Sequence, residues 1–535
     1  ETYLAFAPKG FTSFCMSMPI WLREKLFQKK FLFDKLKQHD ENFNDINKIN
    51  FSEHHYSHAA SAFYPSPFKD AVILTLDGVG EWATTTVAEG SDHKIKISKE
   101  IHFPHSIGLL YSAFTYYTGF KVNSGEYKVM GLAPYGKPKY KDIILKELID
   151  LKEDGSFRLN MKYFNYATGL TMTNKNFSKL FGQEVRNPEK DLLTQFHMDI
   201  ASSIQSVTEE IVLKLTRRLS QESKSKNLCL AGGVALNCVA NGKILKNNIF
   251  QNIWIQPAAG DAGGSLGAAL AFWYKELENK RNQTSSYDEM NGSYLGPSYT
   301  DHEVENTLKF LNAKYEKHSE ENLISIIANE LGNKKTIGWF QGRMEFGPRA
   351  LGSRSILADP RSDKMQKELN LKVKFRESFR PFAPSVLRED VNSWFELNTD
   401  SPYMLLVSDI KKNIQIPMKK EDQKLFGIDK LNIKRSSIPA VTHVDYSARI
   451  QTVHEETNPK YYKLIKKFKE ITNCSVLVNT SFNIRGEPIV CTVEDAFKCF
   501  MGTNLDILVC ESFILHKTKQ EKDLLRDYQN KFELD

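Results

Sequence analysis

Cysteine is scarce in this sequence, which holds seven among 535 residues, and no two of them form a Cys-x-x-Cys pair. The odd count and the missing pair argue against a zinc ribbon and against a disulfide framework, and they fit a reducing cytosol best. Long apolar runs are absent too, since none approaches the ~20 residues of a membrane-spanning helix. We therefore predict a cytoplasmic protein without a membrane span.

Concentrated charge is lacking as well. The net charge is +7 and the sequence pI is about 8.7, but the basic excess is spread thinly along the chain. Nucleic-acid-binding proteins usually gather such charge in one stripe, so no nucleic acid is expected as a partner, whereas anionic small molecules fit equally well. A chain of this length builds a core that needs no structural metal, so a bound metal is expected to be functional.

An α/β pattern fills most of the chain after a polar, amphipathic helical segment at 1–50. Apolar runs predict a buried strand at 70–78, and apolar periodicity predicts a helix at 106–120 and a long amphipathic helix at 192–223. Three glycines and two prolines at 123–138 predict a loop.

Residues 278–303 are polar and show no apolar periodicity, so we interpret them as the crossing between two domains. A second α/β pattern begins near residue 322, with strands predicted in NCSVLVNTSFN and DILVCESFILHK. The predicted organisation is an α/β domain over 1–295 followed by a second domain over 296–535.

Three of the 13 histidines fall within five residues of the segment HHYSHAASAF, which starts at His54. On a helix, His54 and His58 lie on one face, in the geometry of two ligands for one metal. Asp77 ends an apolar strand and is a natural third ligand, because ligands gather at strand ends in α/β sheets. Imidazole and carboxylate suit iron, zinc or manganese better than calcium. Exposed histidines and a turn aspartate are the alternative interpretation.

Two glycine-rich turns, AGGVALN at 231–237 and GDAGGSLGAA at 260–269, each follow a predicted strand and open a helix. Backbone amides in such turns hold phosphates, and the helix N-terminus adds partial positive charge. Neither turn matches a Walker A loop or a dinucleotide fingerprint, so a purely structural turn is the alternative for each. Asp261 either caps the second helix or completes a metal site with His54, His58 and Asp77.

The sharpest stretch of the sequence is rich in arginine. Eight basic side chains crowd into 38 residues: Arg343, Arg349, Arg354, Arg361, Lys372, Lys374, Arg376 and Arg380. Interspersed glycines and prolines place them on loops or short strands, and the acids are too few to pair them on a helical face. Arginine forks and lysine point charges hold phosphates and planar carbonyl anions, with a structural arginine network as the alternative. Polar groups further along could complete such a pocket: Arg449, Ser481, Asn483 and Arg485.

Over nearly the whole chain, these motifs in this order resemble the NodU/CmcH O-carbamoyltransferase family: HHYSHAASAFYPSP, LTLDGVGEWATTT, NSGEYKVMGLAPYG, LAGGVALN, PAAGDAGGSLGAA, WFQGRMEFGPRALGSRSILADPR, FRESFRPFAP and VNTSFNIRGEP. The resemblance implies an α/β, actin-like (ASKHA) metal-binding domain, followed by an α+β domain of the YrdC-like fold. It implies that the second domain forms carbamoyl-AMP from carbamoyl phosphate and ATP, with Mg²⁺, and releases pyrophosphate. The first domain then transfers the carbamoyl group to a hydroxyl of a small-molecule or glycan acceptor, using Fe²⁺ or another divalent metal.

The same resemblance assigns roles to single residues. It implies four metal ligands: His54, His58, Asp77 and Asp261. It implies an adenylate site lined by Gly232, Gly233 and Asn237. The residues implied to hold carbamoyl phosphate or the ATP phosphates are Arg349, Lys374, Arg380, Arg449, Ser481 and Asn483. Lys374 is preferred to Lys372 on spacing alone.

The chain departs from the family at its start, since it opens at ETYLAF without an initiator methionine. We expect a fragment that lacks roughly half a domain of N-terminal chain, and with it a general base for the acceptor hydroxyl.

Three other functions are alternatives. A tRNA-modifying enzyme would need a basic surface, which the diffuse charge does not indicate. A hydrogenase-maturation enzyme would contain Cys-x-x-Cys pairs, which are missing, and an actin-like ATPase would leave the arginine-rich segment unexplained. The acceptor, the metal and a homodimeric assembly stay open.

Overall fold

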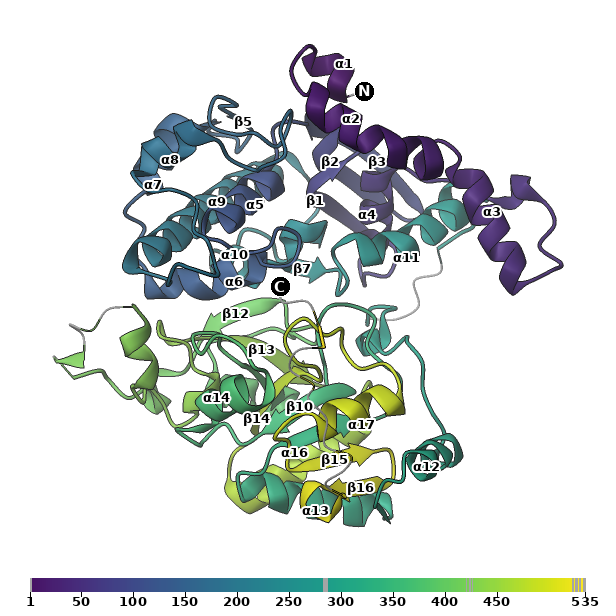
Figure 1. Ribbon diagram of the computed structural model, residues 1–535, viewed down its shortest axis with the longest axis vertical. Helices are drawn as coiled ribbons and strands as arrows, with labels where there is room; N and C mark the ends of the chain where they lie inside the picture. The colour runs from purple at the N-terminus through teal and green to yellow at the C-terminus, as the bar shows by residue number, and fades with distance from the viewer. Residues whose placement is uncertain are drawn as a thin grey trace.

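The computed structural model describes residues 2–281, 287–419, 421, 422, 425, 427–521, 524, 528, 531 and 532. Figure 1 shows a five-stranded sheet with its helices in the upper half and a nine-stranded sheet in the lower half. The strands of the smaller sheet come from 70–255 and those of the larger sheet from 316–516. The predicted α/β class is confirmed, while the domain division near 295 stays a prediction.

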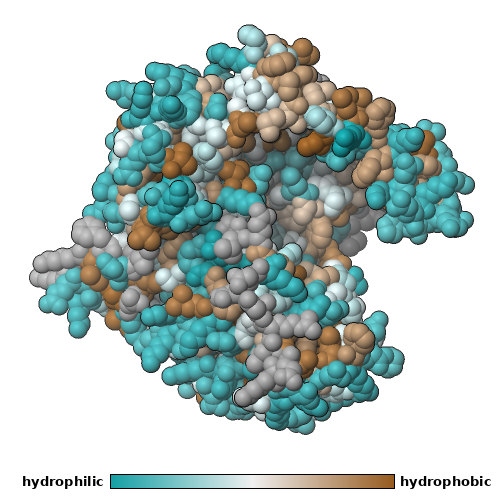
Figure 2. All heavy atoms as spheres, in the orientation of Figure 1, coloured by the Kyte–Doolittle hydropathy of each residue, from teal (hydrophilic) through white to brown (hydrophobic). Residues whose placement is uncertain are grey.

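The predicted helical character of 1–50 is confirmed over most of that segment. It forms α1 (Thr2–Phe6), α2 (Phe11–Ile20), the π-helix η1 (Trp21–Lys25), α3 (Gln28–His39) and the short 3₁₀ turn η2 (Ile46–Lys48). Large apolar side chains on these helices, among them Leu4, Trp21 and Phe27, are more than half exposed. Figure 2 shows brown and tan atoms, with pale and teal ones between them, over the top of the molecule where these helices lie.

The five-stranded sheet has the order β3-β2-β1-β6-β7. Three antiparallel strands, β1 (Asp70–Gly80), β2 (Ala83–Ser91) and β3 (Lys94–His102), are followed in space by β6 (Asn227–Ala231) and β7 (Asn252–Ile255), which run parallel to β1. β1 forms because residues 71–76 are apolar or β-branched and all are buried. β1 pairs in parallel with β6 over Val72–Thr75, so Asp77, just past that stretch of β1, and Gly232, just after β6, lie at the same edge of the sheet.

Helix α4 (His54–Phe63) packs directly against α11 (Asp261–Ala271). Gly267 permits this approach, because a Cβ at that position would lie 1.8 Å from the carbonyl oxygen of Ser57. The remaining elements of this half are α5 (Ile107–Tyr117), α6 (Glu126–Leu132), η3 (Ala133–Tyr135), α7 (Lys141–Ile143), η4 (Ile144–Leu148), β4 (Ile149–Leu151), β5 (Phe157–Leu159), α8 (Lys175–Phe181), α9 (Gln195–Glu222), η5 (Gly233–Leu236), α10 (Cys238–Lys246) and η6 (Phe272–Glu276).

The predicted strand at 70–78 and the predicted helices at 106–120 and 192–223 are confirmed by β1, α5 and α9. The predicted loop at 123–138 is wrong, because α6 and η3 occupy most of it. Val129 and Leu132 are three positions apart and fully buried, so this segment packs as a helix in spite of its glycines and prolines.

The nine-stranded sheet has the order β12-β13-β11-β14-β10-β9-β15-β16-β8. Its pairs are antiparallel except β11 with β13 and β9 with β15. The strands are β8 (Glu316–Lys317), β9 (Ile337–Phe340), β10 (Arg354–Ala358), β11 (Ala383–Leu387), β12 (Leu406–Asp409), β13 (Ser447–Val453), β14 (Val476–Ser481), β15 (Ile507–Cys510) and β16 (Phe513–His516). The predicted strands in NCSVLVNTSFN and DILVCESFILHK are confirmed as β14 and the β15–β16 pair.

Helices α13 (Glu320–Gly332) and α16 (Pro459–Thr472) pack against each other in this half. The other helical elements are α12 (Asp301–Phe310), α14 (Met365–Glu368), the π-helix η8 (Leu369–Val373), α15 (Val391–Trp394) and α17 (Val493–Met501), with short 3₁₀ turns between them. α12 begins inside the segment predicted to be a crossing, at a capping box formed by Thr300 and Glu303. Within the described residues, no helix is both long and apolar enough to cross a bilayer.

Candidate functional site

Four side chains converge at the edge of the five-stranded sheet where β1 and β6 end. His54 and His58 lie one turn apart on α4, Asp77 ends the apolar run of β1, and Asp261 is the first residue of α11. One ligand atom from each of the four lies within 4.8 Å of all the others. The i,i+4 histidine spacing and the strand-end aspartate therefore meet as the sequence indicated.

The contacts inside this cluster are short. Nε2 of His54 lies 2.9 Å from Oδ2 of Asp77 and 3.0 Å from Nε2 of His58. Oδ1 of Asp261 is 3.6 Å from both imidazole Nε2 atoms. The side chains of His58 and Asp77 are largely buried, whereas that of Asp261 is 80% exposed, so the cluster opens to the surface on the α11 side.

Opposite charges dominate the electrostatics of the cluster. Burial opposes protonation of His58, but Asp261 and Asp77 outweigh it and raise the pKa of His58 to about 9. Burial likewise disfavours the charged form of Asp77, yet His54 and His58 hold the pKa of that carboxyl well below its usual range. Two imidazoles and two carboxylates with such convergent atoms form the donor set that iron, zinc or manganese prefers, so these residues fit a divalent metal.

His55, between the two converging histidines, points away from them. Its Nδ1 lies 2.6 Å from Oγ1 of Thr75, which in turn lies 2.6 Å from Oγ1 of Thr86. Burial lowers the pKa of His55 to about 4. This side chain belongs to the buried core of the sheet, as its position on the other helix face predicts.

The glycine turn after β6 adjoins the cluster. The backbone N–H of Gly233 donates to Oδ1 of Asp77 at 3.1 Å, and the N–H of Gly232 donates to Ala259 O in the second glycine-rich turn. Asn237 caps α10 by accepting from Ala240 N, and its amide exchanges hydrogen bonds with Gln205. These contacts give Asn237 a structural function, and the predicted adenylate contacts of all three residues stay predictions.

A cavity of about 800 Å³ lies between the two halves of the molecule. Helices α6, α9 and α10 line it from one side, and the β10–β14 region of the larger sheet lines it from the other. Its described lining holds seven basic side chains, namely Lys243, Arg349, Lys374, Arg376, Arg380, Arg449 and Arg485, against three acidic ones, Glu209, Asp445 and Glu487. A recess lined by charge of one sign concentrates counter-ions, so the cavity is suited to an anion.

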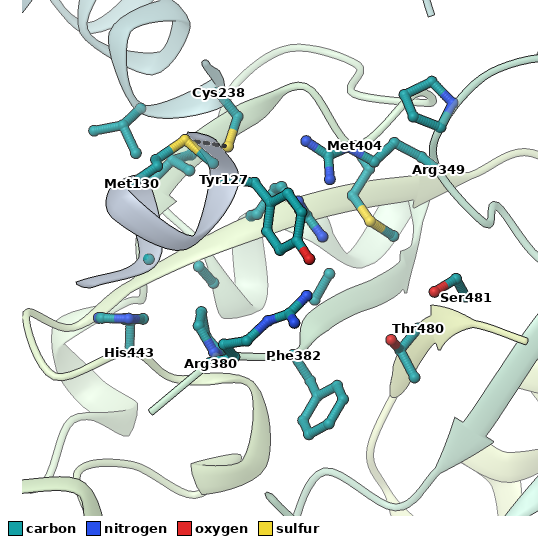
Figure 3. Close-up of a pocket in the computed structure, with 18 of the residues that line it drawn as sticks. Tyr127, Met130, Cys238, Arg349, Arg380, Phe382, Met404, His443, Thr480 and Ser481 are labelled. Atoms are coloured by element: carbon teal, nitrogen blue, oxygen red, sulfur yellow. Dashed lines mark hydrogen bonds between the residues drawn. The ribbon is translucent and has the colours of Figure 1, made fainter. Parts of the chain in front are cut away.

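Arg349 and Arg380 extend into the cavity beside Tyr127 (Figure 3). The guanidinium of Arg380 lies 4.5 Å from the centre of the Tyr127 ring. Nε of Arg349 is buried and has no hydrogen-bond partner among the described residues. Burial and the neighbouring Arg449 lower the pKa of Arg349 to about 9, and burial also lowers the pKa of Arg449. These cations are held in a buried recess whose described lining has fewer acidic than basic side chains.

Lys374 is 2% exposed, and its ammonium is surrounded by oxygen atoms. Nζ donates to the carbonyl oxygens of Ser481 and Asn483 at 2.7 and 2.8 Å and to Oδ1 of Asn483 at 2.6 Å. Burial lowers the pKa of Lys374 well below its usual range. Ser481 and Asn483 line the same cavity, so they act first as the frame that holds this lysine.

A π-helix explains why Lys374 rather than Lys372 enters the cavity. The N–H of Lys374 donates to Leu369 O, five residues earlier, which closes the wide turn η8. Lys372 lies within η8 and is exposed, whereas Lys374 follows it and turns inward. The prediction that these basic residues lie on loops or short strands is therefore wrong for Lys372.

Three arginines of the predicted cluster, Arg343, Arg354 and Arg361, are not in the cavity lining and have structural contacts. Arg354 is fully buried, donates to four carbonyl oxygens and lies 3.6 Å from the centre of the Phe340 ring. Arg361 forms a fork with Asp359, and Arg343 donates to Leu295 O. The segment thus contains both a structural arginine network and the basic side chains of a cavity, so each interpretation of the sequence holds for part of it.

Arg376, one of the eight basic residues of the predicted cluster, lines the cavity, donates to Oδ1 of Asn370 at 2.7 Å and lies 4.8 Å from the centre of the Phe382 ring. Sequence reasoning did not single out two further residues, Glu377 and Tyr127. Glu377 lies 3.9 Å from Lys128, 3.5 Å from Arg485 and 3.8 Å from Arg380, and these cations, Lys128 first, hold its pKa below the usual range against the effect of burial. Tyr127 comes from the segment predicted to be a loop, which concealed its position on a helix.

Known protein families and relatives resemble this chain over most of its length. The family model described as "Carbamoyltransferase N-terminus" matches residues 1–270, and "Carbamoyltransferase C-terminus" matches residues 328–517. An uncharacterized protein of Synechocystis sp. is 60% identical over 539 residues, which cover 100% of this chain and 87% of that protein. Nodulation protein NolNO of Sinorhizobium fredii is 40% identical over 88% of this chain and 65% of its own length. Nodulation protein NolO of Bradyrhizobium diazoefficiens is 37% identical over 87% of this chain and 78% of its own length.

Proposed function

This chain belongs to the NodU-type carbamoyltransferase family, and from that premise we propose an O-carbamoyltransferase that acts through carbamoyl-AMP. In the proposed first step, carbamoyl phosphate, ATP and water give carbamoyl-AMP, phosphate and pyrophosphate. In the second step, a hydroxyl of a small-molecule or glycan acceptor attacks the carbamoyl carbon and AMP leaves. The observation that carries the proposal is the cationic cavity between the two halves, next to a cluster of four potential metal ligands.

The proposed fold assignment follows the same division. An antiparallel three-stranded sheet edge followed by two parallel strands supports an actin-like fold for the part that carries the histidine cluster. The mixed nine-stranded sheet with its cationic recess supports a YrdC-like, adenylate-forming fold for the other part.

The cavity supports the adenylation step through its charge. Carbamoyl phosphate and ATP are both anions, so their mutual repulsion must be screened before they approach each other. Arg349, Arg380 and Arg449 are fixed in the recess before any substrate arrives, and preorganised cations of this kind stabilise a developing or departing phosphate charge. The ammonium group of Lys374 already donates its hydrogen bonds to Ser481 and Asn483. The backbone of Lys374 holds the loop that carries Arg485 against the same recess, because the N–H of Arg485 donates to Lys374 O.

The histidine cluster supports the transfer step. His54, His58, Asp77 and Asp261 would hold a divalent ion such as Fe²⁺, and Gly233 fixes the orientation of Asp77. Such an ion acts as a Lewis acid on a carbonyl oxygen or neutralises a phosphate. The open side at Asp261 leaves room for an acceptor, while the buried His58 keeps the opposite side closed.

The two sites are close enough for an internal transfer. Gly233 contacts Asp77 of the cluster, and Cys238 lines the cavity. Five residues of chain span at most about 18 Å even when they are fully extended. A labile adenylate can therefore pass between the sites over a short distance, which limits its exposure to water.

The test measures pyrophosphate and carbamoyl-AMP after incubation of the purified chain with ATP and carbamoyl phosphate, without acceptor. We expect pyrophosphate release that depends on carbamoyl phosphate and disappears in Arg349→Ala. Arg343→Ala is the matched control, because Arg343 belongs to the same segment but lies outside the cavity lining. Absence of pyrophosphate from a folded chain would contradict adenylate formation, and release of ADP instead would favour an actin-like ATPase.

A further inference from the structure

The connection between β9 and β10, residues 341–353, carries Arg349 and is anchored by a buried glutamate. Oε1 of Glu345 accepts three backbone N–H groups, from Leu351 at 2.7 Å, Ser353 at 2.8 Å and Arg354 at 3.2 Å. Glu345 itself is only 5% exposed and does not line the cavity. One carboxylate oxygen therefore fixes the backbone immediately after Arg349.

A second set of buried polar side chains holds the same backbone from the opposite side. Nε2 of Gln451 donates to Leu351 O at 2.7 Å, and Nδ2 of Asn479 donates to Ala350 O at 3.2 Å. Oε1 of Gln451 accepts from Ser385 at 2.6 Å and from Asn479 at 2.9 Å. Leu351 thus has both its N–H and its C=O bound by side chains, and Ala350 has its C=O bound, with Gln451 and Asn479 reaching the loop from β13 and β14.

This arrangement lowers folding stability more than a turn with a purely structural role requires. Oε2 of Glu345 is buried without a hydrogen-bond partner among the described residues, and such a group normally lowers stability. The side chain of Arg349 gives the arrangement a purpose. Since Nε of Arg349 also lacks a partner, its direction into the cavity depends on the backbone to which it is attached.

We propose that Glu345 is a positioning residue that fixes Arg349 for anion binding, a role that rests on the proposed function of the cavity. The carboxylate accepts three N–H groups at one point, which a neutral amide oxygen does less strongly. A small displacement of a binding group costs affinity steeply, because the geometry of a preorganised site is lost.

The experiment measures the dissociation constant of carbamoyl phosphate, and separately of inorganic pyrophosphate, by calorimetry in wild type, Glu345→Gln, Arg349→Ala and the double variant. Arg349→Ala is expected to raise Kd about tenfold to a hundredfold. Glu345→Gln is expected to raise Kd about tenfold in the wild-type background and to have no further effect when Arg349 is already alanine.

Asp359→Asn is the matched control. Asp359 is a fully buried carboxylate directly after β10, bound to Arg361 and not part of the cavity lining. This change is expected to lower the melting temperature and to leave Kd unchanged. If Glu345→Gln fails to fold, Gln451→Leu removes the clamp on Leu351 O and is expected to show the same dependence on Arg349.

Two outcomes would overturn the inference: an unchanged Kd in the folded Glu345→Gln variant, or an equal rise in both Arg349 backgrounds. The proposed function fails in a different way. If wild type binds pyrophosphate but not carbamoyl phosphate, the carbamoyl donor is wrong while the positioning effect is still measured on pyrophosphate. If wild type binds neither anion, both ideas are wrong.

Discussion

Replacing Asp77 with asparagine is expected to abolish tight metal binding while the fold is retained. Asp77 is the centre of the histidine cluster, because Oδ2 lies 2.9 Å from Nε2 of His54 and 3.3 Å from Nε2 of His58. Asparagine has the same shape and keeps an oxygen for the N–H of Gly233, so the turn after β6 is preserved. What disappears is the negative charge between two imidazoles.

The size of the effect follows from the contacts of that carboxylate. A hydrogen bond to a charged group is worth about 1.5–3 kcal/mol, and the carboxylate of Asp77 contacts two imidazoles, or one shared metal ion in their place. A loss of about 3 kcal/mol weakens metal binding roughly 100-fold. The lowered pKa of Asp77 shows that the cluster favours the ionised carboxylate even though burial opposes it.

The assay is anaerobic titration with Fe²⁺ or Mn²⁺, followed by elemental analysis of the desalted protein. Asp199→Asn is the control, since Asp199 is a buried carboxylate on α9 that binds Lys139 and the N–H of Lys137 and does not belong to the histidine cluster. Wild type and Asp199→Asn should retain about one ion per chain, and Asp77→Asn should retain almost none. Wild-type affinity in Asp77→Asn, or an equal loss in Asp199→Asn, would refute the assignment of this cluster to a metal.

Three further predictions address packing, pH and the cavity. Gly267→Ala should lower the melting temperature and impair metal binding, because the new Cβ would clash with Ser57 O. The control is Gly264→Ala in the same helix, which has open space around it and should raise the melting temperature slightly. Burial and Arg186 lower the pKa of His197, which caps α9, to about 4, so its stabilising contribution is present above pH 6.5 and is lost as the pH falls toward 4. Wild type should therefore lose up to about 2 kcal/mol between pH 7 and pH 5 that His197→Asn does not, measured by urea unfolding. Lys374→Met leaves several buried oxygens of Ser481 and Asn483 unpaired, so pyrophosphate release should fall more than about tenfold, with an unchanged rate contradicting the role of that lysine.

The convergence of the histidine cluster was predictable from sequence because its signals are local. The four-residue spacing of His54 and His58 has one meaning on a helix, and an aspartate after a buried strand lies at a known edge of a sheet. The long amphipathic helix α9 was predictable for the same reason, since its apolar periodicity extends over many turns. Where a pattern is set by near neighbours in the chain, the sequence and the structure agree.

The arginine-rich segment shows the limit of such reasoning. Arg349 and Arg354 are five residues apart with similar surroundings in sequence, yet one extends into the cavity and the other is buried against Phe340. Their difference depends on carbonyl oxygens of Pro297 and Gln341, which only the tertiary fold brings to Arg354. The inward turn of Lys374 depends similarly on a π-helical hydrogen bond that residue type does not reveal.

The backbone around Arg349 also bears on how the two sites can cooperate. A Cβ on Gly347 would lie 3.1 Å from Pro257 O, so the loop that carries Arg349 runs directly over the turn that leads to Asp261. On the other side, residues 233–238 run from the contact with Asp77 to the cavity lining. Asp77 thus accepts a hydrogen bond from a segment that continues to the cavity lining, and Asp261 follows a turn that the Arg349 loop approaches closely. Because packed backbone segments cannot interpenetrate, the Arg349 loop has no room to move toward the Pro257 turn unless that turn moves as well.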